Sequence, residues 1–478
     1  MSGDVLFPFG FHRLAPNNVV AVSASGDHAF LSDAELHALV HNSAELDIET
    51  LAELKAKWFL GSETASGSLR LLTSRIAARR ETVLTGPSLH IVVPTLQCAH
   101  SCRYCQVSRS LDAEGVSMTQ NQLRASCDSI FDSTAPTLTV EFQGGDPLLR
   151  FDLIENAVLR IEEINRSERR SIRFVVASTL HQLTVSMCNF FRTHSVLLST
   201  SLDGPRDLHN VNRPLATHDS YERTLNGIQL ARRELGPHSV SALMTTTRES
   251  LGQPEAIVDE YVSRGFDEIF IRPVSPYGFA RRNARRLGYS HDEFRVFYQR
   301  AFGRVLYWNR KGVRIRECAA SIALNKILSP FDAGYVDSQN PTGAGLATLV
   351  YNYDGFVYPS DEARMLAETG DTSLRLGRIG ERLTDLLDTP VVRMLVEASL
   401  VQYIPGCRDC AFNTYCGPDP VQAQSQFGSM HVPVQWTEHC QRQTWLFEFI
   451  FAWLKAADAW STDLAFDWAQ PAARRRDA

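Results

Sequence analysis

Between residues 88 and 275, short apolar runs alternate with longer segments whose apolar residues recur with helical periodicity. The runs have the length of buried strands, and the segments have the pattern of amphipathic helices. This alternation predicts an α/β fold, a parallel sheet with helical crossovers, and its six strand–helix units suit a partial TIM-type (β/α)6 barrel. The predicted strands are 89–94, 138–143, 172–177, 195–201, 239–245 and 268–273, and the predicted helices are 119–131, 150–165, 182–193, 220–235 and 253–264.

Polar residues follow the predicted strands at their carboxyl ends. In parallel barrels the reactive residues lie at this edge, where the loops after the strands meet. A structural accident does not readily explain the same pattern at six strand ends, so we expect one site assembled from several of them. The residues concerned are Cys98, Gly144-Gly-Asp146, Ser178-Thr179, Ser201-Leu-Asp203, Thr245-Thr-Thr247 and Arg272.

The chain continues on both sides of this core. Before it, an apolar hairpin around Ser23–Asp27 and a capping box, Ser32-Asp-Ala-Glu35, predict a small α+β module of winged-helix type. After it, the pattern predicts a long helix over 291–311 and a hairpin with a two-residue turn at Asp354-Gly355. We therefore predict four segments, which are a module 1–85, a core 86–290, an extension 291–460 and a flexible tail 461–478.

Composition indicates a soluble globular protein. The 478 residues are 44% hydrophobic and 21% charged with a net charge of −6, so neither nucleic acid nor a membrane is expected as a partner. Met1–Val5 lacks the start of a signal peptide, and the apolar stretch Leu446–Leu454 is too short to span a bilayer. The 10 cysteines occur in clusters with ligand-like spacing, which indicates the reducing cytoplasm and not a disulfide scaffold.

Three of the cysteines, Cys98, Cys102 and Cys105, lie directly after the first predicted strand of the core. A [4Fe–4S] cluster takes one thiolate per iron, so three thiolates leave one iron open for a substrate or cofactor. Two other interpretations exist for the same residues. They could form a zinc knuckle with His100 as the fourth ligand, or they could be three buried apolar cysteines.

The spacing of these cysteines, with Tyr104 before the last thiol, resembles the signature of the radical S-adenosylmethionine (SAM) superfamily. The resemblance implies that SAM binds the open iron through its amino and carboxylate groups. Gly144-Gly-Asp-Pro147 resembles the segment that holds the SAM amino group, although Asp146 stands where Glu is usual. Other matching positions approach the SAM ribose and carboxylate. The implied cofactor-binding residues are Tyr104, Gly144, Gly145, Asp146, Ser178, Ser201, Asp203 and Arg213.

A second set of cysteines lies near the C-terminus, and it consists of Cys407, Cys410, Cys416 and Cys440. Four such thiolates can bind a structural zinc or a fully ligated iron–sulfur cluster. The set resembles the SPASM extension of radical SAM proteins, which often carries two auxiliary clusters. At three positions where that extension usually has cysteine, this chain has another residue, so the resemblance implies one auxiliary [4Fe–4S] cluster. Those positions are Thr342, Ser360 and Pro420.

The other cysteines are assigned separately. Cys127 and Cys188 fall in predicted helices, where we expect small buried apolar groups. Cys318 could be a further ligand of a metal centre.

Longer strings across nearly the whole chain resemble one subfamily, the His-Xaa-Ser system radical SAM maturases of the B type. The resemblance implies that the substrate is a ribosomally made precursor peptide with His-Xaa-Ser repeats, and that a second radical SAM maturase works beside this one. The matching strings are Phe7–Phe11, Phe30–Ser32, Gly86–His90, Cys105–Arg109, Glu141–Gly145, Ser199–Pro205, Ser241–Thr247 and Cys407–Cys416.

The implied activity is the reductive cleavage of SAM to a 5′-deoxyadenosyl radical, which removes hydrogen from the peptide. It requires an electron donor such as flavodoxin or ferredoxin. The N-terminal module is then either a docking domain for the peptide or a structural cover over the barrel. Two other functions stay open, namely SPASM-type oxidation of a side chain in another protein or small molecule, and a non-catalytic iron–sulfur scaffold that presents peptide to a sister enzyme.

Asp361 is the candidate catalytic base. Sulfatase maturases, distant relatives in the superfamily that this chain resembles, have an Asp with this role directly after the cysteine that follows such a hairpin. Tyr358-Pro-Ser360-Asp361 aligns with that string, although Ser360 stands in place of the cysteine. A carboxylate in a partly desolvated pocket has its pKa raised toward the working pH, as a base requires. The alternative is that Asp361 caps the helix that Glu362 would begin.

Overall fold

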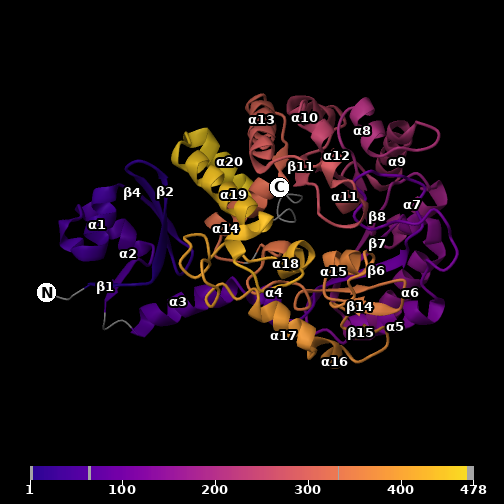
Figure 1. The fold of residues 1–478 in the computed structure, drawn as a ribbon, viewed down its shortest axis with the longest axis horizontal. Coiled ribbons are helices and arrows are strands. Elements are labelled where there is room, and N and C mark those ends of the chain that lie inside the picture. Colours follow the sequence, from indigo (N-terminus) through magenta and orange to yellow (C-terminus); the bar gives the residue numbers. More distant parts are fainter. Residues whose placement is uncertain (1–3, 63–65, 332, 471–478) are drawn as a thin grey trace. The chain divides into compact units, whose positions relative to one another are not determined.

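The computed structural model describes residues 4–62, 66–331 and 333–470, and its elements are labelled in Figure 1. The chain divides into two compact units, each built from segments that are far apart in the sequence. The first unit combines Met1–Leu84, Ala320–Gly343 and Val396–Ala478. The second unit combines Thr85–Ala319 and Ala344–Leu395.

The second unit is built on a ten-stranded sheet in the order β12-β11-β10-β9-β8-β7-β6-β13-β14-β15. Neighbouring strands from β12 to β13 run parallel, and the last two pairs are antiparallel. The predicted α/β class with a central parallel sheet is confirmed. The strands are β6 (Leu89–Thr95), β7 (Thr137–Gly144), β8 (Ser171–Ala177), β9 (Leu197–Ser201), β10 (Val240–Thr246), β11 (Glu268–Pro273), β12 (Arg316–Glu317), β13 (Thr348–Tyr351), β14 (Phe356–Tyr358) and β15 (Gly377–Arg378).

Helices connect the parallel strands, and the strands bury one face against an apolar core. On β7, Leu138, Val140 and Phe142 are buried, while the residues between them point to the opposite face. The helices of this unit lie close to their predicted positions. They are α5 (Gln120–Ile130), α6 (Phe151–Glu168), α7 (Val185–Thr193), α8 (Arg206–Asn212), α9 (Ser220–Leu235), α10 (Pro254–Ser263), α11 (Gly278–Arg282), α12 (Ala284–Leu287), α13 (His291–Arg310), α15 (Asp361–Ala367) and α16 (Leu383–Leu387).

The predicted hairpin after the core is present, and it widens the sheet because β13 pairs with β6. Its turn is longer than the predicted two residues. The N–H of Gly355 donates to the carbonyl of Asn352 (3.0 Å), so Tyr353 and Asp354 are the central residues of the turn. Gly355 follows them with a φ of +84°, a conformation that glycine adopts most easily. The Asp354-Gly355 pair therefore has a different place in the turn from the one predicted.

The N-terminal part of the first unit contains the predicted hairpin within a three-stranded antiparallel sheet. The predicted capping box is present, with Ser32 and Glu35 bonding to each other's backbone. Apolar residues of the sheet and helices form a common core that includes Val19, Leu39 and Phe59. The elements are β1 (Asp4–Leu6), β2 (Phe9–Ala15), β3 (Asn18–Ser23), β4 (His28–Leu31), α1 (Asp33–His41), α2 (Ile48–Ala56), β5 (Leu60–Ser62), α3 (Ser66–Ala78) and α4 (Glu81–Leu84).

The C-terminal part of the first unit is helical, and it corrects one prediction. Residues 461–469 do not form a flexible tail, because they belong to α20 (Ala459–Ala469), where Ala465 and Trp468 are buried. Burial of a large aromatic side chain offsets the entropy lost when the segment becomes ordered. Residues 471–478 of that predicted tail lie outside the described residues. The other helices after β12 are α14 (Cys318–Leu328), α17 (Pro390–Glu397), α18 (Pro420–Phe427) and α19 (Glu438–Lys455).

Among the residues that the structure describes, no helix combines the length and the apolar character needed to cross a bilayer.

Candidate functional site

A cavity of about 180 Å³ lies at the carboxyl edge of the parallel strands in the second unit. Cys98, Cys102 and Cys105 line it, together with residues from the ends of β7, β9, β10 and β11. The structure therefore brings the three thiols together with most of the strand ends that the sequence singled out. The other lining residues include Tyr104, Arg109, Gly144, Gly145, Thr179, Ser201, Arg213, Thr245 and Arg272.

The loop that carries the three thiols is held by backbone hydrogen bonds. The N–H of Cys98 donates to the carbonyl of Ser110 (2.9 Å), and the N–H of Cys105 donates to the carbonyl of Cys102 (3.2 Å). Burial raises the pKa of the Cys98 thiol to about 11, and the charges of Asp146 and Cys105 raise it further. Burial also raises the pKa of Cys102. Metal binding must therefore displace protons from these thiols.

His100 lines the same cavity as the three thiols. Its Nε2 lies 2.9 Å from the hydroxyl of Ser220, and its ring centroid is 4.4 Å from that of His181. Within the described residues, no group of three or more His, Cys, Asp or Glu side chains is arranged to hold a single metal ion. In a [4Fe–4S] cluster each thiolate binds a different iron, so the three-thiol set fits a cluster with one open iron.

Gly144 and Gly145 bring the end of β7 against the start of the cysteine loop. A Cβ atom at Gly144 would lie 2.2 Å from the carbonyl oxygen of Thr95, and one at Gly145 would lie 2.3 Å from that of Leu96. Gly144 also has a φ of +133°, which other residues rarely adopt. The two glycines are therefore required for the close approach of two backbone segments, and both line the cavity.

Asp146 lies behind the cavity wall. Its carboxylate accepts hydrogen bonds from the hydroxyls of Ser178 (2.6 Å) and Thr179 (2.5 Å), and it is buried. Burial raises the pKa of Asp146, against the effect of these hydrogen bonds. Thr179 lines the cavity, whereas neither Asp146 nor Ser178 is among the lining residues. The acid therefore positions the Thr179 hydroxyl at the wall.

Tyr104, Asp203 and Arg213 form a buried triad. The Tyr104 hydroxyl lies 2.8 Å and 2.9 Å from the two carboxylate oxygens of Asp203, and the Arg213 guanidinium donates to that hydroxyl (2.9 Å). Tyr104 and Arg213 line the cavity, and Asp203 stands behind them. The Nε of Arg213 is buried and makes no hydrogen bond within the described residues. A buried guanidinium with an unused donor beside the thiols fits an anionic group such as the SAM carboxylate.

Glu141 is a carboxylate that the sequence did not single out. It lies in the middle of β7, on the face opposite the buried residues, and its side chain keeps some access to solvent. Gln143 donates a hydrogen bond to its Oε1 (2.9 Å). Burial raises the pKa of Glu141 from 4.5 to about 7, the hydrogen bond from Gln143 opposes this, and the charge of Asp361 adds to it.

This shift predicts a pH-dependent stability. Folded Glu141 binds its proton more tightly than the unfolded chain does, so its contribution is complete below about pH 4.5 and is lost as the pH rises to about 7. At about 1.4 kcal/mol per pKa unit, the loss is at most about 3.5 kcal/mol. Glu141→Gln should remove it. Hydrogen exchange of β7 amides measures the difference, because a chain with two units need not unfold in one step. A difference between the proteins that does not change with pH would contradict the prediction.

Asp361 is the first residue of α15, and it is not the cap of that helix. The cap is Ser360, whose hydroxyl accepts from the N–H of Ala363 (3.2 Å). The carboxylate of Asp361 accepts from two nitrogens of Arg364, at 2.9 Å and 2.5 Å. The Arg364 side chain is fully buried. The capping alternative for Asp361 is therefore replaced by a buried ion pair.

The second set of cysteines lies in the first unit. Cys440 is in the first turn of α19, where the cap Thr437 accepts from its N–H (3.1 Å). Burial raises the pKa of Cys416, and the charges of Cys410, Cys407 and Cys440 raise it further. The four thiols therefore lie in one region of the first unit, although within the described residues no three of them are positioned to hold a single metal ion. The helix N-terminus at Cys440 favours a thiolate.

Three cysteines belong to neither set, namely Cys127, Cys188 and Cys318. Cys127 in α5 and Cys188 in α7 are fully buried, as predicted. Cys318 begins α14 and belongs to the second unit, where the charges of Glu268 and Glu317 add to the effect of burial and raise its thiol pKa.

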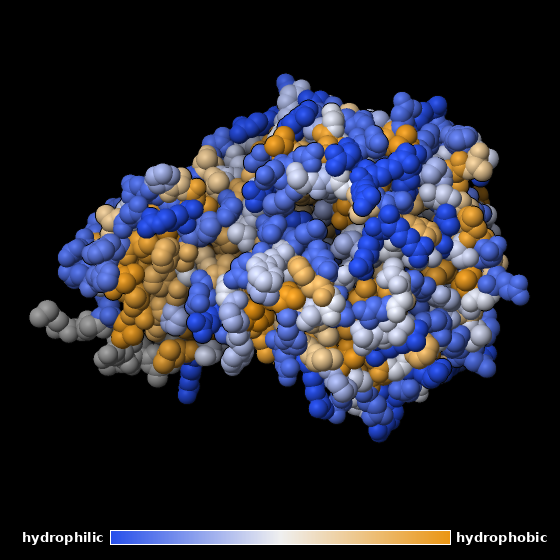
Figure 2. All heavy atoms as spheres, viewed as in Figure 1, coloured by the Kyte–Doolittle hydropathy of each residue, from blue (hydrophilic) through white to orange (hydrophobic). Residues whose placement is uncertain are grey.

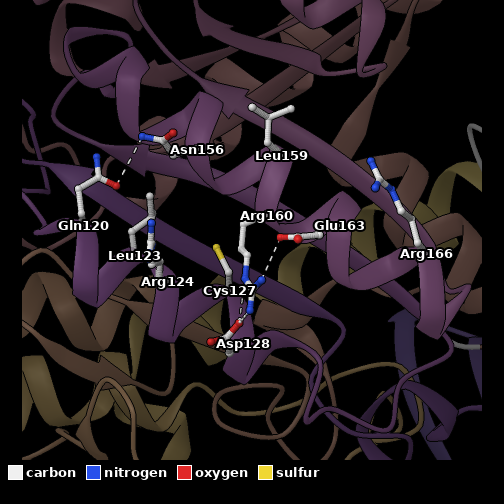
Figure 3. Close-up of a pocket in the computed structure, with 10 residues that line it drawn as sticks. All are labelled: Gln120, Leu123, Arg124, Cys127, Asp128, Asn156, Leu159, Arg160, Glu163 and Arg166. Carbon is white, nitrogen blue, oxygen red and sulfur yellow. Dashed lines mark hydrogen bonds and ion pairs between the residues drawn. The ribbon is translucent and has the colours of Figure 1, made fainter.

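A second hollow lies between α5 and α6 (Figure 3). Arg160 reaches across it to Asp128 (2.9 Å) and also bonds to Glu163 (2.9 Å), so much of its charge is paired internally. Cys127 points toward it, and no residue of either cysteine set lines it. We assign it no chemistry.

The comparisons with known proteins agree with this geometry. Residues 92–261 match the family model described as the radical SAM superfamily. In sequence, the chain is 26% identical over 188 residues to an uncharacterized protein of Methanothermobacter thermautotrophicus, covering 39% of this chain and 67% of that protein. It is 21% identical over 339 residues to one of Archaeoglobus fulgidus, covering 70% and 75%.

Two solved structures share the fold. Native anSMEcpe with bound AdoMet and Cp18Cys peptide has a TM-score of 0.65 and 18% identity, covering 80% of this chain and 100% of that chain. SuiB of Streptococcus suis, bound to its precursor peptide SuiA, has a TM-score of 0.55 and 12% identity, covering 92% and 100%. At these identities the likeness concerns the fold. Residues 92–261 are therefore similar to the radical SAM superfamily, and the chain shares its fold with the anSMEcpe and SuiB structures.

Proposed function

We propose that this chain is a radical SAM maturase that modifies a ribosomally made peptide of the His-Xaa-Ser type. One observation carries the proposal, namely that three thiols, the Gly144-Gly145 turn and the Arg213 guanidinium share one cavity. Two structures with this fold were determined with peptides bound, which supports a peptide substrate. The His-Xaa-Ser assignment rests on the strings quoted above.

The residues of the cavity have separate tasks in this proposal. Cys98, Cys102 and Cys105 hold the cluster, and Arg213 binds the SAM carboxylate while Tyr104 and Asp203 fix its position. The Gly145 backbone and the hydroxyls of Thr179 and Ser201 offer polar contacts to the rest of SAM. When bound, the cluster and SAM supply a 5′-deoxyadenosyl radical, which removes hydrogen from the peptide.

We assign peptide docking to the N-terminal module, residues 1–85, with 86–290 as the radical SAM core and 291–460 as a SPASM-like extension. Hydrophobic surface gathers over the N-terminal module (Figure 2). Its exposed apolar side chains include Phe11 and Ile48, which are 48% and 83% exposed. Exposed apolar surface of this kind is typical of a binding site for another chain.

We assign Cys407, Cys410, Cys416 and Cys440 to one auxiliary [4Fe–4S] cluster. In the described residues their grouping supports this, as does the absence of cysteine at positions 342, 360 and 420. The alternative is a structural zinc, which four thiolates also bind.

Iron analysis separates these assignments. After anaerobic reconstitution we expect two clusters, about eight irons per chain. About four irons with one zinc would show that the second set is a zinc site. About twelve irons would mean a third cluster with ligands outside the two sets, with Cys318 the first to test.

The proposal also names partners and a compartment. The enzyme requires an electron donor such as flavodoxin or ferredoxin, and it works beside a second radical SAM maturase. Its ten free cysteines are consistent with the reducing cytoplasm. Nucleic acid and membranes are not among its expected partners, given the net charge of −6.

A second candidate function is oxidation of a side chain in another protein or a small molecule. The peptide in the anSMEcpe structure is compatible with this function as well as with the first. Mass spectrometry of the His-Xaa-Ser peptide after co-expression with this chain decides between the two. A change in peptide mass supports the maturase, and an unmodified peptide beside active SAM cleavage supports the alternative. Loss of both activities in a cluster-loaded protein would leave the non-catalytic scaffold.

A further inference from the structure

A series of hydrogen bonds between buried side chains ends at the cysteine loop. The loop residue His100 is buried and lines the cavity together with the three thiols. Behind it lie His209, from α8, and Ser220, the first residue of α9, and both are fully buried. The Ser220 hydroxyl lies 2.9 Å from Nε2 of His100 and 3.2 Å from Nε2 of His209. One hydroxyl therefore joins two imidazole rings.

The direction of these hydrogen bonds follows from the residue farthest from the loop. The backbone N–H of Asp203 donates to Nδ1 of His209 (3.4 Å), so this nitrogen carries no proton. Burial lowers the pKa of His209 well below its usual range, in keeping with a neutral ring whose one proton is on Nε2. The nearest acceptor for that proton is Ser220, because Thr224 is farther away at 3.5 Å. The proton of the Ser220 hydroxyl is then donated to Nε2 of His100.

This direction places the proton of His100 on Nδ1, because Nε2 is the acceptor. Nδ1 of His100 is buried and has no hydrogen-bond partner in the part of the chain that the structure describes. A buried N–H without a partner is costly, so we expect the partner to be a group that binds in the cavity. A nitrogen that carries a proton acts as a hydrogen-bond donor and not as a metal ligand.

The position of His100 indicates which group that is. His100 lies between Cys98 and Cys102 in the sequence, and its ring is held through Nε2. Its carbonyl accepts a hydrogen bond from Nε of Arg109 (2.5 Å). Burial raises the pKa of the Cys98 thiol, and a hydrogen bond from the backbone N–H of His100 to that sulfur opposes the effect. The ring is therefore fixed beside the thiols, where a bound cluster would present its sulfur atoms.

We propose that Nδ1–H of His100 donates a hydrogen bond to a sulfur atom of the cluster and thereby raises its reduction potential. The inference rests on the part of the proposed function that places a cluster at the three thiols. On reduction the cluster gains one electron from the electron donor and one negative charge. A hydrogen bond to sulfur therefore stabilises the reduced form more than the oxidised form. Ser220 and His209 act through His100 as positioning residues, and none of the three touches the peptide.

The test is a redox titration of the reconstituted full chain, monitored by EPR in the absence of SAM and peptide. In His100→Gln the side-chain amide reaches the place of Nε2, so the contact with Ser220 is kept and the donor to the cluster is lost. In His100→Asn the amide takes the place of Nδ1, so the donor is kept. His100→Gln should lower the ratio of reduced to oxidised cluster at a given potential about tenfold, which is about 59 mV for one electron. His100→Asn should stay near the wild-type potential.

The matched control is His90→Gln. His90 is also fully buried in the second unit, but both of its ring nitrogens have partners, Pro87 (3.0 Å) and Tyr351 (3.3 Å), and it does not line the cavity. The control should therefore leave the potential unchanged. The EPR signal of the cluster in question is the one that is missing when Cys98, Cys102 and Cys105 are replaced by Ala.

A second measurement requires no substitution that could affect folding. In wild-type protein labelled with 15N-histidine, pulsed EPR of the reduced cluster should detect one weakly coupled histidine nitrogen, as expected across a hydrogen bond. His100→Asn should remove this coupling.

Three outcomes overturn the inference. One is an unchanged potential in a His100→Gln protein that holds the wild-type amount of iron. Another is the absence of any histidine coupling in the wild type. The third is a strong coupling, which would show that His100 binds the metal directly. Failure of the proposed function is distinguishable, because the wild type would then modify no peptide while the shift in potential persists. A wild type that binds no iron at the three thiols overturns both.

Discussion

Replacement of Cys98, Cys102 and Cys105 together by Ala is expected to abolish the release of 5′-deoxyadenosine. The three thiols line one cavity with Arg213, and without thiolates the protein has no ligands there for iron. The variant should also bind about four fewer irons per chain than the wild type. Both quantities are measured after anaerobic reconstitution, with chromatography of the nucleoside after chemical reduction.

The control for this variant is the replacement of Cys127 and Cys188 by Ala. Both residues are fully buried in helices of the same unit, and neither lines the cavity. The control therefore changes buried thiols of the same kind without affecting the candidate iron ligands. Release of 5′-deoxyadenosine at the wild-type rate by the triple variant would refute the assignment of the cavity.

The core of the fold followed from the sequence because each of its elements has a local pattern. The apolar run 89–94 corresponds to β6, and the amphipathic segment 220–235 corresponds to α9. Contacts between distant segments have no such pattern. β13 pairs with β6 although helices and strands of the whole core separate them in the sequence.

The sequence also did not predict which distant segments combine to form the first unit. Arg79 donates a hydrogen bond to the carbonyl of Lys326 (2.8 Å), and Tyr415 donates one to the carbonyl of Gly26 (2.9 Å). These contacts join the N-terminal module to segments much later in the chain. Every residue has a backbone carbonyl oxygen, so any residue type can accept such a hydrogen bond. The sequence therefore does not indicate which residue is the acceptor.

The sequence predicted that residues at the strand ends form the site. It did not predict which of their side chains point into the cavity. Cys98, Gly144 and Ser201 line the cavity as their places after strands implied. Asp146 and Asp203 also follow strands, yet they face hydroxyl groups behind the wall. A carboxylate can satisfy its charge with either a ligand or a neighbouring hydroxyl, and the strand pattern does not distinguish the two.

Glu141 has a recognisable signal in the sequence. It is an acidic residue within the apolar run of β7, where a charge is expensive unless it is paired or shifted to its neutral form. Such an interruption of a predicted buried strand indicates a residue with a function on the other face.

Replacement of Asp361 by Asn is expected to lower peptide modification by about a hundredfold or more, while 5′-deoxyadenosine still forms. Asn keeps the size and one hydrogen-bond acceptor of Asp but cannot take up the proton that the peptide loses. Loss of the Asp361 charge should also lower the pKa of Glu141, because that charge raises it in the wild type. Modified peptide and nucleoside are quantified in the same reaction.

Asp361→Asn also breaks the ion pair with Arg364, which can destabilise the fold. A double variant separates this effect from the loss of the base. Arg364 is fully buried, and removing one partner of a buried pair can cost about 3–5 kcal/mol of stability. The double variant Asp361→Asn with Arg364→Gln has no uncompensated charge, so it should recover stability without recovering peptide modification. Recovery of both would show that Asp361 serves the fold through Arg364 and is not a base.

The matched control for Asp361→Asn is Asp385→Asn. Asp385 also pairs with an arginine at the same spacing, Arg382 (2.7 Å), but this pair is exposed to solvent. Exposed pairs contribute little to stability, so the control should keep both stability and peptide modification. If Asp361→Asn behaves like this control, with unchanged peptide modification, Asp361 is not the base. A loss of modification in Asp361→Asn alone, at intact nucleoside release, places proton removal from the peptide at this carboxylate.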